Sequence, residues 1–474
     1  MQEFDLLIVG GGSGTQVGSL AAERGMSVAV CEPGPLGGAC ITRGCVPSKA
    51  LIRRADAIRQ ARDADRLGID VEVDDVDLDA ITSEVRETVY EKAEHQAENL
   101  RESDDHTLFD GRARFVDDRT VEIEGYDERV RGDRVVVAVG AETTVPPIDG
   151  LEDADYLTST DALYLDERPD ELAIIGGGYI GAELGHFYET IGSEVTIVQR
   201  SDALVPREDG EVREAVTESF ADRERCTLHV GREATAVEER GDRIAMFAEG
   251  QGEEVEIEAD ELLVAGGRKP ATDDLGCEAA GIALDDAGFV EVDETLETTA
   301  ENVWAFGDVI EGPMFKHVAD HEARVVAANA VAERGEEIEY EGVAHAVFTW
   351  PQVAACGRTE EELEEEGREY ERARFEYDSA PLGLVSKENG FVKVLAEPDG
   401  TVLGCHIVGP EAATLIHEVA VAGRVGEGSV DEIAEAIHVH PALNEVVLGA
   451  FDELADPPLS TAPDWSDVSM EPGD

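Results

Sequence analysis

Two cysteines separated by four residues, Cys40 and Cys45, have the side-chain chemistry and the spacing of a redox dithiol. They lie in residues 37–49, which read GGACITRGCVPSK. A structural zinc usually takes its ligands from two short spacings, and the sequence has no second cysteine pair. Pro47 and the apolar-periodic run after it indicate a helix that begins at or near Cys45, and a helix N-terminus favours thiolate. The spacing alone leaves a redox role and two unpaired structural cysteines as open alternatives.

The remaining cysteines are scattered singly, and we expect them to be small buried hydrophobic residues. An odd total of seven does not form a secreted disulfide framework. The N-terminus has no signal-peptide pattern, and no apolar run approaches the roughly 20 residues that span a membrane. The sequence therefore predicts a cytoplasmic protein with no membrane partner. The five single cysteines are Cys31, Cys226, Cys277, Cys356 and Cys405.

The charge balance is extreme, with 107 acidic against 38 basic residues in 474 and a formal net charge of -69. Nucleic acid is excluded as a natural partner because phosphate binding needs a basic surface. A hydrophobic content of 42% argues against disorder. Our hypothesis is a folded protein adapted to concentrated salt, in which surface repulsion is screened.

Residues 4–32 predict a strand, a glycine loop, a helix and a second strand that ends in an acid. Gly10, Gly12 and Gly14 form the loop, which would let a pyrophosphate approach the helix N-terminus. Glu32 would accept a hydrogen bond from a ribose hydroxyl. Thr15 stands where the third glycine of the motif is expected, but the context on both sides favours dinucleotide binding over a merely structural turn.

Helices are expected from about residue 45 to 64 and from 78 to 100, followed by an antiparallel meander of strands at 113–115, 120–123 and 134–139. The last strand ends at Gly140, and the pair Pro146-Pro147 with Gly150 marks a domain boundary.

A second strand, glycine loop, helix and strand follow in residues 172–198. The complete motif is present here as Gly176, Gly178 and Gly181. Where an acid would select the ribose of NAD, the chain reads Gln199-Arg200, and Arg207 follows. These arginines would suit a 2′-phosphate, so the sequence favours NADPH, with ordinary surface arginines as the alternative.

The strand expected at 302–306, with Gly307 and Asp308 after it, indicates a return to the first unit, since an aspartate at a strand end can bind a sugar hydroxyl. The strand at 262–267, which ends at Gly267, closes the second unit. The first domain is therefore predicted to be split by the second.

Together these motifs resemble the flavin-dependent pyridine-nucleotide disulfide oxidoreductases, and the resemblance covers nearly the whole chain. The loop from Cys40 to Lys49 resembles the redox loop of that family, with Ala39 in place of the usual threonine. Gly307-Asp308 is similar to its second flavin motif. The resemblance implies FAD, NADP or NAD, and a homodimer with an active site shared between subunits.

The same resemblance implies roles for individual residues. Cys45 would exchange electrons with the flavin and Cys40 with a small disulfide or dithiol. Lys49 and Glu183 would lie beside the flavin N5, and Tyr179 would cover the nicotinamide pocket. His440, oriented by Glu445, would come from the other subunit and protonate the leaving thiolate. Further cofactor-binding positions are Gly10, Gly12, Gly14, Glu32, Gly140, Gly307 and Asp308 for FAD, and Gly176, Gly178, Gly181, Arg200, Arg207 and Gly267 for NAD(P).

The implied fold class is α/β: two Rossmann-like dinucleotide-binding domains, the second inserted in the first, and a C-terminal α+β dimerisation domain. We expect the FAD-binding domain at 1–148 and 267–340, the NAD(P)-binding domain at 149–266, the dimerisation domain at 341–455 and a disordered tail at 456–474.

In the third domain we expect a strand at 346–350, a hairpin of 391–395 with 403–408, and a helix around 412–422. The acidic run 360–366 predicts a solvated helical face with no functional role. A capping box, Ser429 with Glu432, opens a helix before His438 and His440. These histidines could suggest a metal, but no third ligand is evident nearby, so no metal is predicted.

The sequence leaves two candidate activities, which differ in their substrate. Residues 316–326 and 440–447 are closer to mycothione reductase, which with Arg200 and Arg207 favours an NADPH-dependent reductase of a small disulfide such as bis-γ-glutamylcystine. The alternative is dihydrolipoyl dehydrogenase, whose redox loop is nearly this one. Mercuric reductase is disfavoured because residues 456–474 contain no cysteine pair. A flavoprotein that binds nucleotide without turnover is a further class, and the intact Cys40, Cys45, His440 and Glu445 set argues against it.

Overall fold

The computed structural model describes residues 1–250, 252–457 and 465. Its first sheet has seven strands, six of them in the order β3-β2-β1-β6-β5-β4, and β16 pairs with residues 135–137 of β6, beyond the residues that pair with β5. β1 is parallel to β2 and β6, β2 is parallel to β3, and β16 is parallel to β6. The strands are β1 Gln2–Val9, β2 Val28–Cys31, β3 His106–Phe109, β4 Ala113–Asp117, β5 Thr120–Ile123, β6 Val130–Val137 and β16 Val303–Ala305.

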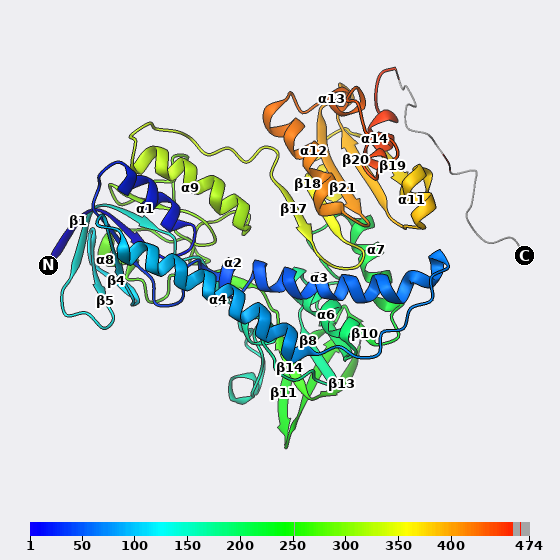
Figure 1. The fold of residues 1–474 in the computed structure, drawn as a ribbon, viewed down its shortest axis with the longest axis horizontal. Helices are drawn as coiled ribbons and strands as arrows, with labels where there is room; N and C mark the ends of the chain where they lie inside the picture. Colours follow the sequence, from blue (N-terminus) through cyan, green and yellow to red (C-terminus); the bar gives the residue numbers. More distant parts are fainter. Residues whose placement is uncertain (251, 458–464, 466–474) are drawn as a thin grey trace, which may run out of the picture.

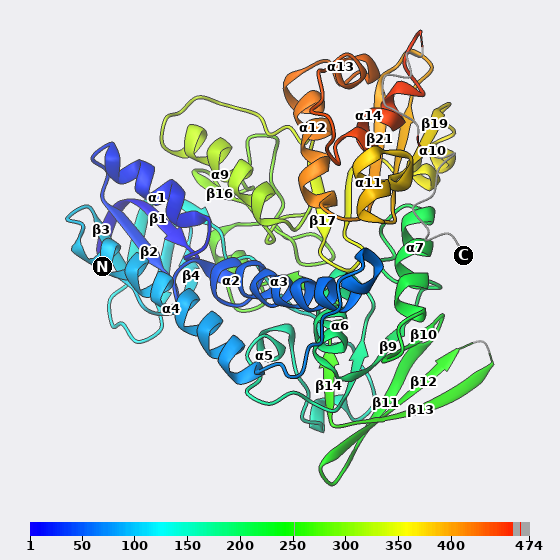
Figure 2. The same ribbon diagram turned by 45° about the vertical axis from the view of Figure 1, so that its right-hand side comes forward.

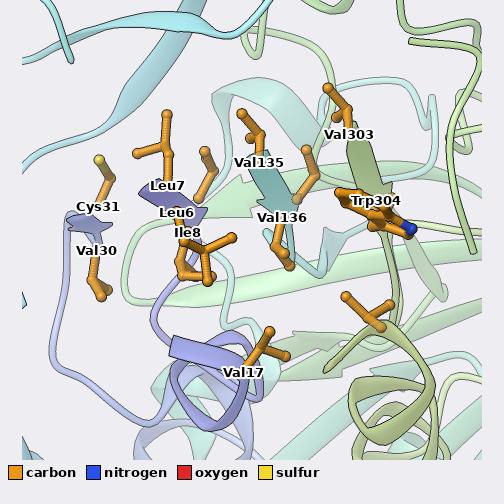
Figure 3. Close-up of a cluster of buried hydrophobic side chains, with 14 of the residues drawn as sticks. Leu6, Leu7, Ile8, Val17, Val30, Cys31, Val135, Val136, Val303 and Trp304 are labelled. Atoms are coloured by element: carbon orange, nitrogen blue, oxygen red, sulfur yellow. The ribbon is translucent and has the colours of Figure 1, made fainter. Parts of the chain in front are cut away.

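The central strands of this sheet are continuous apolar runs because side chains are buried on both of its faces. Figure 3 shows Leu7, Val30, Val136 and Trp304 from neighbouring strands in one cluster. The helices α1 Gly14–Glu23 and α9 Lys316–Ala330 contribute to the same core. Cys31 lies in it as a small apolar side chain, and the other four single cysteines are buried as expected.

The expected meander is present, since β4 pairs antiparallel with β5, and β5 with β6. Both expected helices also form, α3 as Cys45–Arg62 and α4 as Leu78–Glu102. In Figures 1 and 2, α3 runs from the first sheet towards the other two parts of the molecule. Short helical turns join these elements: α2 Gly38–Thr42, η1 Asp63–Leu67, η2 Leu151–Asp153, α5 Ser159–Ala162 and α8 Cys277–Ala280.

The chain leaves the first sheet through β7, Ala141–Thr143, and returns through β15, Arg268–Pro270, and these two strands pair antiparallel. The sheet between them has the order β10-β9-β8-β14 and is parallel throughout. An antiparallel sheet of β11, β12 and β13 projects from it at the lower right of Figure 2. The elements are β8 Glu171–Ile175, α6 Tyr179–Ile191, β9 Glu194–Gln199, α7 Gly210–Ala221, β10 Cys226–Val230, β11 Glu233–Arg240, β12 Arg243–Gly250, β13 Glu253–Ala259 and β14 Glu261–Val264.

The third part is a five-stranded antiparallel sheet in the order β17-β18-β21-β20-β19. Its elements are β17 Ala344–Val347, β18 Val353–Gly357, α10 Glu360–Glu366, β19 Glu371–Glu376, η3 Tyr377–Ser379, α11 Pro381–Ser386, β20 Phe391–Ala396, β21 Val402–Val408, α12 Ala412–Val425, α13 Val430–Ala434 and α14 Glu445–Asp452. The capping box of Ser429 and Glu432 opens α13 as expected.

The strand expected at 346–350 is displaced towards the N-terminus. β17 ends at Val347 because the next backbone amide, that of Phe348, donates to the side chain of Glu183 at 3.0 Å instead of continuing the ladder.

The acidic helix α10 was predicted to be a solvated face, and this prediction is wrong for its first turn. Lys393 is 1% exposed and lies 2.5 Å from Glu360 and 2.9 Å from Asp209 at the start of α7. Glu361 receives a hydrogen bond of 2.7 Å from Arg213 on α7. A buried cation needs anionic partners, so these carboxylates join the third sheet to the second part of the chain.

The fold class is therefore the predicted α/β arrangement with an antiparallel C-terminal sheet. The domain limits at 148/149, 266/267 and 340/341 remain predictions. The predicted disordered tail falls mainly on residues 458–464 and 466–474, outside the described residues. No helix in the described part of the chain is long and apolar enough to cross a membrane.

Candidate active site

The two cysteines of the redox stretch come together at a helix junction. Cys40 lies within α2, and Cys45 is the first residue of α3. A side chain at Gly44 would place its Cβ 2.9 Å from the carbonyl oxygen of Ala39, so this tight turn requires glycine. Cys45 is exposed, Cys40 is half-buried, and the two thiols form a hydrogen bond.

The pKa values of the two thiols are shifted in opposite directions. The pKa of Cys45 is lowered to about 6, first by the hydrogen bond from Cys40 and then by the charge of Lys49. The same hydrogen bond and burial raise the pKa of Cys40, while the charge of Lys316 opposes this rise. Two of the six lysines in the sequence thus act on this pair, one on each sulfur. The thiolate, which is the nucleophile, resides on Cys45 when the pair is reduced.

Lys49 is held by Glu183, and the place of both residues beside the flavin N5 remains a prediction. Lys49 Nζ lies 2.7 Å from Glu183 Oε2, and this contact joins α3 to α6. The other oxygen of Glu183 accepts the amide of Phe348, whose ring lies 4.8 Å from Lys49 Nζ. The carboxylate is nearly buried, so the pair is screened weakly and holds the lysine beside Cys45.

Lys316 is a further residue of this region that was not predicted as a site residue. It pairs with Asp320 one turn along α9, and Asp320 also accepts from Ser13 at 3.0 Å and Gln16 at 2.6 Å. This cluster ties α9 to the first glycine loop and brings a cation near Cys40. The i,i+4 spacing of Lys316 and Asp320 indicated an ion pair, but only the tertiary fold places it near a cysteine.

The first glycine loop has a site for a nucleotide. Gly10 has φ 113°, and a Cβ there would lie 2.2 Å from the carbonyl oxygen of Ala138. Gly12 faces open space, where a Cβ would meet only the Cα of Gly38 at 3.8 Å. Glu32 accepts from the amide of Gly11 at 2.7 Å, and it lines a cavity of about 300 Å³ with Gly10. These features fit the pyrophosphate and a ribose of FAD.

The other predicted FAD positions lie around this loop. Gly14 is buried against Ile8, and Gly140 and Gly307 have φ of 70° and 76° at the ends of β6 and β16. Asp308 is 3.8 Å from Arg268, and burial raises the pKa of its carboxyl. The adjacent ends of parallel strands are where α/β sheets bind ligands, so these positions fit an elongated dinucleotide.

The second glycine loop has the same arrangement, with close backbone contacts at its first and third glycines. A Cβ at Gly176 would lie 2.4 Å from the oxygen of Ala265, and one at Gly181 only 1.9 Å from the oxygen of Gly176. Gly178 has no atom within 4 Å of its Cβ position, so a phosphate could approach the backbone there. Gly267, with φ 121°, follows β14 at the same sheet edge.

The residues expected to read the 2′-position are at the surface. Gln199 Oε1 accepts the amide of Gly177 at 2.8 Å, in the place of the acid. Arg200 has 82% of its side chain exposed and lies 3.9 Å from Glu233, and Arg207 is also exposed. The 2′-phosphate role of both arginines remains a prediction.

Tyr179 opens α6 and lies in a group of rings from all three parts of the chain. Its hydroxyl donates to Glu208 Oε1, which also lies 2.8 Å from His345 Nε2. The Tyr179 ring stacks with those of His345 and Phe315, at centroid distances of 5.9 and 6.5 Å. Sequence reasoning missed Glu208 and His345 because they come from distant segments.

His440 and Glu445 form the expected pair, with His440 Nδ1 2.8 Å from Glu445 Oε1. The side chain of His440 is 61% exposed, whereas that of Glu445 is 4% exposed. They line an open hollow of about 730 Å³ that contains neither redox cysteine. His438 instead lies 2.9 Å from Glu418. Among the residues that the structure describes, no three His, Cys, Asp or Glu side chains are grouped as metal ligands.

Comparison with known proteins agrees with this arrangement. Residues 4–323 match the family described as pyridine nucleotide-disulphide oxidoreductase, and residues 343–451 match its dimerisation domain. The chain is 34% identical over 466 residues to dihydrolipoyl dehydrogenase of Bacillus subtilis, covering 96% of this chain and 97% of that one. It is 36% identical over 427 residues to mercuric reductase of Staphylococcus aureus, covering 90% and 78% respectively.

The dihydrolipoyl dehydrogenase of Haloferax volcanii is 35% identical over 467 residues, with 96% and 97% of the two chains covered. A similar solved structure is that of the HOCl-induced flavoprotein disulfide reductase RclA from Escherichia coli. It superposes with a TM-score of 0.83 at 26% identity and covers 95% of this chain and 99% of that chain.

Proposed function

Because this chain belongs to the pyridine nucleotide-disulphide oxidoreductase family, we propose that it is an NADPH-dependent reductase of a small, carboxylated disulfide. Bis-γ-glutamylcystine is the candidate substrate. The balanced reaction converts one disulfide, NADPH and a proton into two thiols and NADP. The observation that carries the proposal is the neutral Gln199 at the nucleotide loop, where an acid would repel a 2′-phosphate.

A second observation supports a carboxylated substrate. Lys316 is near the thiol that would meet the substrate, Cys40, on a protein whose net charge is -69. Such a surface repels anions in general, so Lys316, although it is paired with Asp320, would offer a substrate carboxylate a cation beside the reacting sulfur.

When bound, the flavin would supply two-electron transfer between the nicotinamide and the cysteine disulfide. Cys45 would hold the thiolate on the flavin side, stabilised by Lys49. Cys40, which is still a thiol, would pass its proton to the His440 imidazole and then attack the substrate disulfide as a thiolate. Reduction opens the Cys40–Cys45 bond, and exchange forms a mixed disulfide on Cys40. Attack by Cys45 on Cys40 then closes the bond again and releases the second thiol.

His440 would protonate the first leaving thiolate, and Glu445 would orient its ring. The exposed position of His440, in a hollow without the cysteines, supports a homodimer in which the histidine serves the partner subunit. The matched dimerisation domain supports the same assembly.

Dihydrolipoyl dehydrogenase is the second candidate. Relatives with this name match 96% of the chain at 34–35% identity. In that case the same residues would oxidise a dithiol and reduce NAD.

A substrate comparison separates the candidates. The FAD-loaded protein is assayed for NADPH oxidation with bis-γ-glutamylcystine and for NAD reduction with dihydrolipoamide, in low and in molar salt. We expect the first activity to dominate, and dominance of the second would reject the small-disulfide reductase in favour of the dehydrogenase. A Cys45→Ser variant is expected to lose both activities, whereas Cys226→Ser, at a buried position outside the site, is the matched control.

The acidity of the reduced pair gives an independent test. Because the pKa of Cys45 is about 6, alkylation of the dithiol by iodoacetamide should rise through this pH and level off near neutrality. Mass spectrometry of the modified peptide reports which sulfur reacts. Alkylation that rises only above pH 8 would contradict the assignment of the thiolate to Cys45.

A further inference from the structure

Two cysteines that stand far apart in the sequence lie opposite each other in the third sheet. Cys356 on β18 pairs with Cys405 on β21 in the antiparallel ladder. Directly opposite residues of an antiparallel pair share one face of the sheet, so the two side chains are neighbours. Both are free thiols in the apolar core that this sheet forms with α12, a core that contains neither Cys40 nor Cys45 (Figure 1). The redox mechanism therefore leaves this pair unused.

The hydrogen bonds of the ladder define the separation of the two cysteines. Two residues further along, the amide of Arg358 donates to the directly opposite Leu403 at 2.8 Å. Hydrogen-bonded pairs recur at every second position, so Cys356 and Cys405 also form such a pair, with Cα atoms about 5.5 Å apart. The commonest Cα separation in a disulfide is about 5.5–6 Å. The backbone therefore already has the spacing that a disulfide needs.

The next pair along the ladder allows the strands to adjust. It consists of two glycines, Gly357 and Gly404. The backbones lie close together there, because a Cβ at Gly357 would be only 2.3 Å from the carbonyl oxygen of Leu403. Cβ atoms of opposite residues are about 4.5–5.5 Å apart, whereas a disulfide needs about 3.5–4.5 Å. The strands must close slightly to form the bond, and a pair without side chains does not resist this movement.

Burial makes this pair far less acidic than the first one. It raises the pKa of Cys356 to about 11, whereas the pKa of Cys45 is about 6. Burial, followed by the charges of Cys356 and Glu418, also raises the pKa of Cys405. The phenol of Tyr377 is near Cys405 too, and burial raises its pKa. Both thiols are therefore protonated at neutral pH, and they react slowly because the thiolate is the nucleophile.

Cys356 is the more accessible of the two thiols. It is 8% exposed, whereas Cys405 is fully buried. Cys356 is also the last residue but one of β18 and faces Ala344, the first residue of β17. The end of a ladder opens more readily than its centre, so a small reagent reaches Cys356 first.

We propose that Cys356 and Cys405 are a second redox dithiol, which small disulfides oxidise to a cross-strand disulfide. Cys356 loses its proton and attacks one sulfur of the small disulfide, and the other sulfur leaves as a thiolate and takes up a proton. Cys405 then attacks Cys356 in the mixed disulfide, which forms the Cys356–Cys405 bond and releases the second thiol in the same way. The two cysteines lose two electrons, and one small disulfide becomes two thiols. Neither flavin nor nucleotide takes part, so this reaction does not depend on the proposed function.

The test is peptide mapping of the full-length, FAD-loaded protein after exposure to hydroxyethyl disulfide. The protein is first reduced and desalted, and samples are stopped with acid and excess N-ethylmaleimide before digestion. We expect two peptides joined through Cys356 and Cys405, formed about tenfold faster for each pH unit between pH 7 and 9, because the thiolate fraction of Cys356 rises in this way below its pKa. The Cys40–Cys45 bond should form earlier and depend little on pH in this range, since Cys45 is already ionised.

Cys226 is the matched control within the same protein. It is 9% exposed and burial raises its pKa to about 12, but it faces Val195 in its ladder. We expect Cys226 to form no crosslink. Cys405→Ala should leave Cys356 as a mixed disulfide with the probe, whereas Cys356→Ala should leave Cys405 unmodified.

The unmodified protein decides the outcome even if either variant is unstable. Absence of the Cys356–Cys405 link at pH 9, in samples whose Cys40–Cys45 bond is complete, would overturn the second dithiol. Links from Cys226 to either cysteine that are as frequent as the Cys356–Cys405 link would also overturn it, because they would show that the bond forms between unfolded chains.

Discussion

In both glycine loops the side chain that ends the second strand accepts a hydrogen bond from the middle glycine. Gly11 donates to Glu32 at 2.7 Å, and Gly177 donates to Gln199 at 2.8 Å. The turn is fastened equally well by a carboxylate and by an amide. What differs is the charge offered to a ligand, so this position has a structural task that both loops share and a ligand-selecting task that separates them.

The loops also differ in where the helix begins. α6 starts directly after the second glycine of its motif, whereas α1 starts one residue later in the equivalent alignment, at Gly14. In the second loop, Gly181 packs directly against the carbonyl of Gly176. In the first loop the equivalent residue, Thr15, is accommodated and its hydroxyl donates to the carbonyl of Gly12 at 2.9 Å.

The largest expected effect is therefore that of a methyl group at Gly181. Its Cβ would lie 1.9 Å from a backbone oxygen, so the loop must move, at a cost of about 1–3 kcal/mol for overpacking. We expect Gly181→Ala to weaken NADPH binding about 100-fold, measured by calorimetry, with FAD retained. Thr15→Ala is the matched change in the first loop and should alter neither cofactor by more than a few-fold. Equal losses in both variants would contradict the difference in helix start.

A second pair of substitutions tests the open space above each loop. Cβ atoms fit at Gly12 and Gly178, so Gly12→Ala and Gly178→Ala should fold with melting temperatures near that of the unmodified protein. If the space receives a pyrophosphate, each methyl should weaken its own cofactor about tenfold to 100-fold, FAD in the first case and NADPH in the second. Absorbance of retained FAD and calorimetry with NADPH provide the measurements. Loss of the same cofactor from both variants would refute the assignment of one nucleotide to each loop.

Local patterns were sufficient to predict most of the architecture, because both strand-loop-helix-strand units, the split first sheet and the helix at Cys45 depend on glycines and short-range periodicity. These local patterns failed where contacts between residues far apart in the sequence determine the structure. The acidic run that begins at residue 360 was predicted to face solvent, but the fold packs Lys393 against it. β17 ends early because the side chain of Glu183 accepts the backbone amide of Phe348. Lys316, Glu208 and His345 were missed as site residues for the same reason, since each acts on a residue far away in the sequence.

The difference in charge between Glu32 and Gln199 predicts that an acid at position 199 will change the nucleotide preference. Gln199→Glu gives the second loop the acid of the first, and one carboxylate oxygen can still accept from Gly177. The other can accept from Ser201 once its hydroxyl, which now accepts from the Gln199 amide and donates to Ala203 at 3.2 Å, turns towards the carboxylate. Repulsion of the 2′-phosphate should weaken NADPH about tenfold and leave NADH unchanged or tighter. Ratios of kcat/KM for the two nucleotides check this. An unchanged ratio would show that Gln199 does not face the 2′-position.

The reverse substitution, Glu32→Gln, should have a smaller effect on its cofactor but a measurable effect on the fold. The two oxygens of Glu32 accept from two amides, those of Gly11 and, at 3.0 Å, Gly34, whereas an amide has only one oxygen. Gly34 is exposed, so water can satisfy the lost bond and the cost stays near 1 kcal/mol. We expect about fivefold weaker FAD retention and a melting temperature lower by a few degrees. The loops would then differ in which bond the exchange costs: Gln199→Glu keeps the bond from the loop amide and loses only that of the Ser201 hydroxyl to Ala203, whereas Glu32→Gln loses the bond from the amide of Gly34.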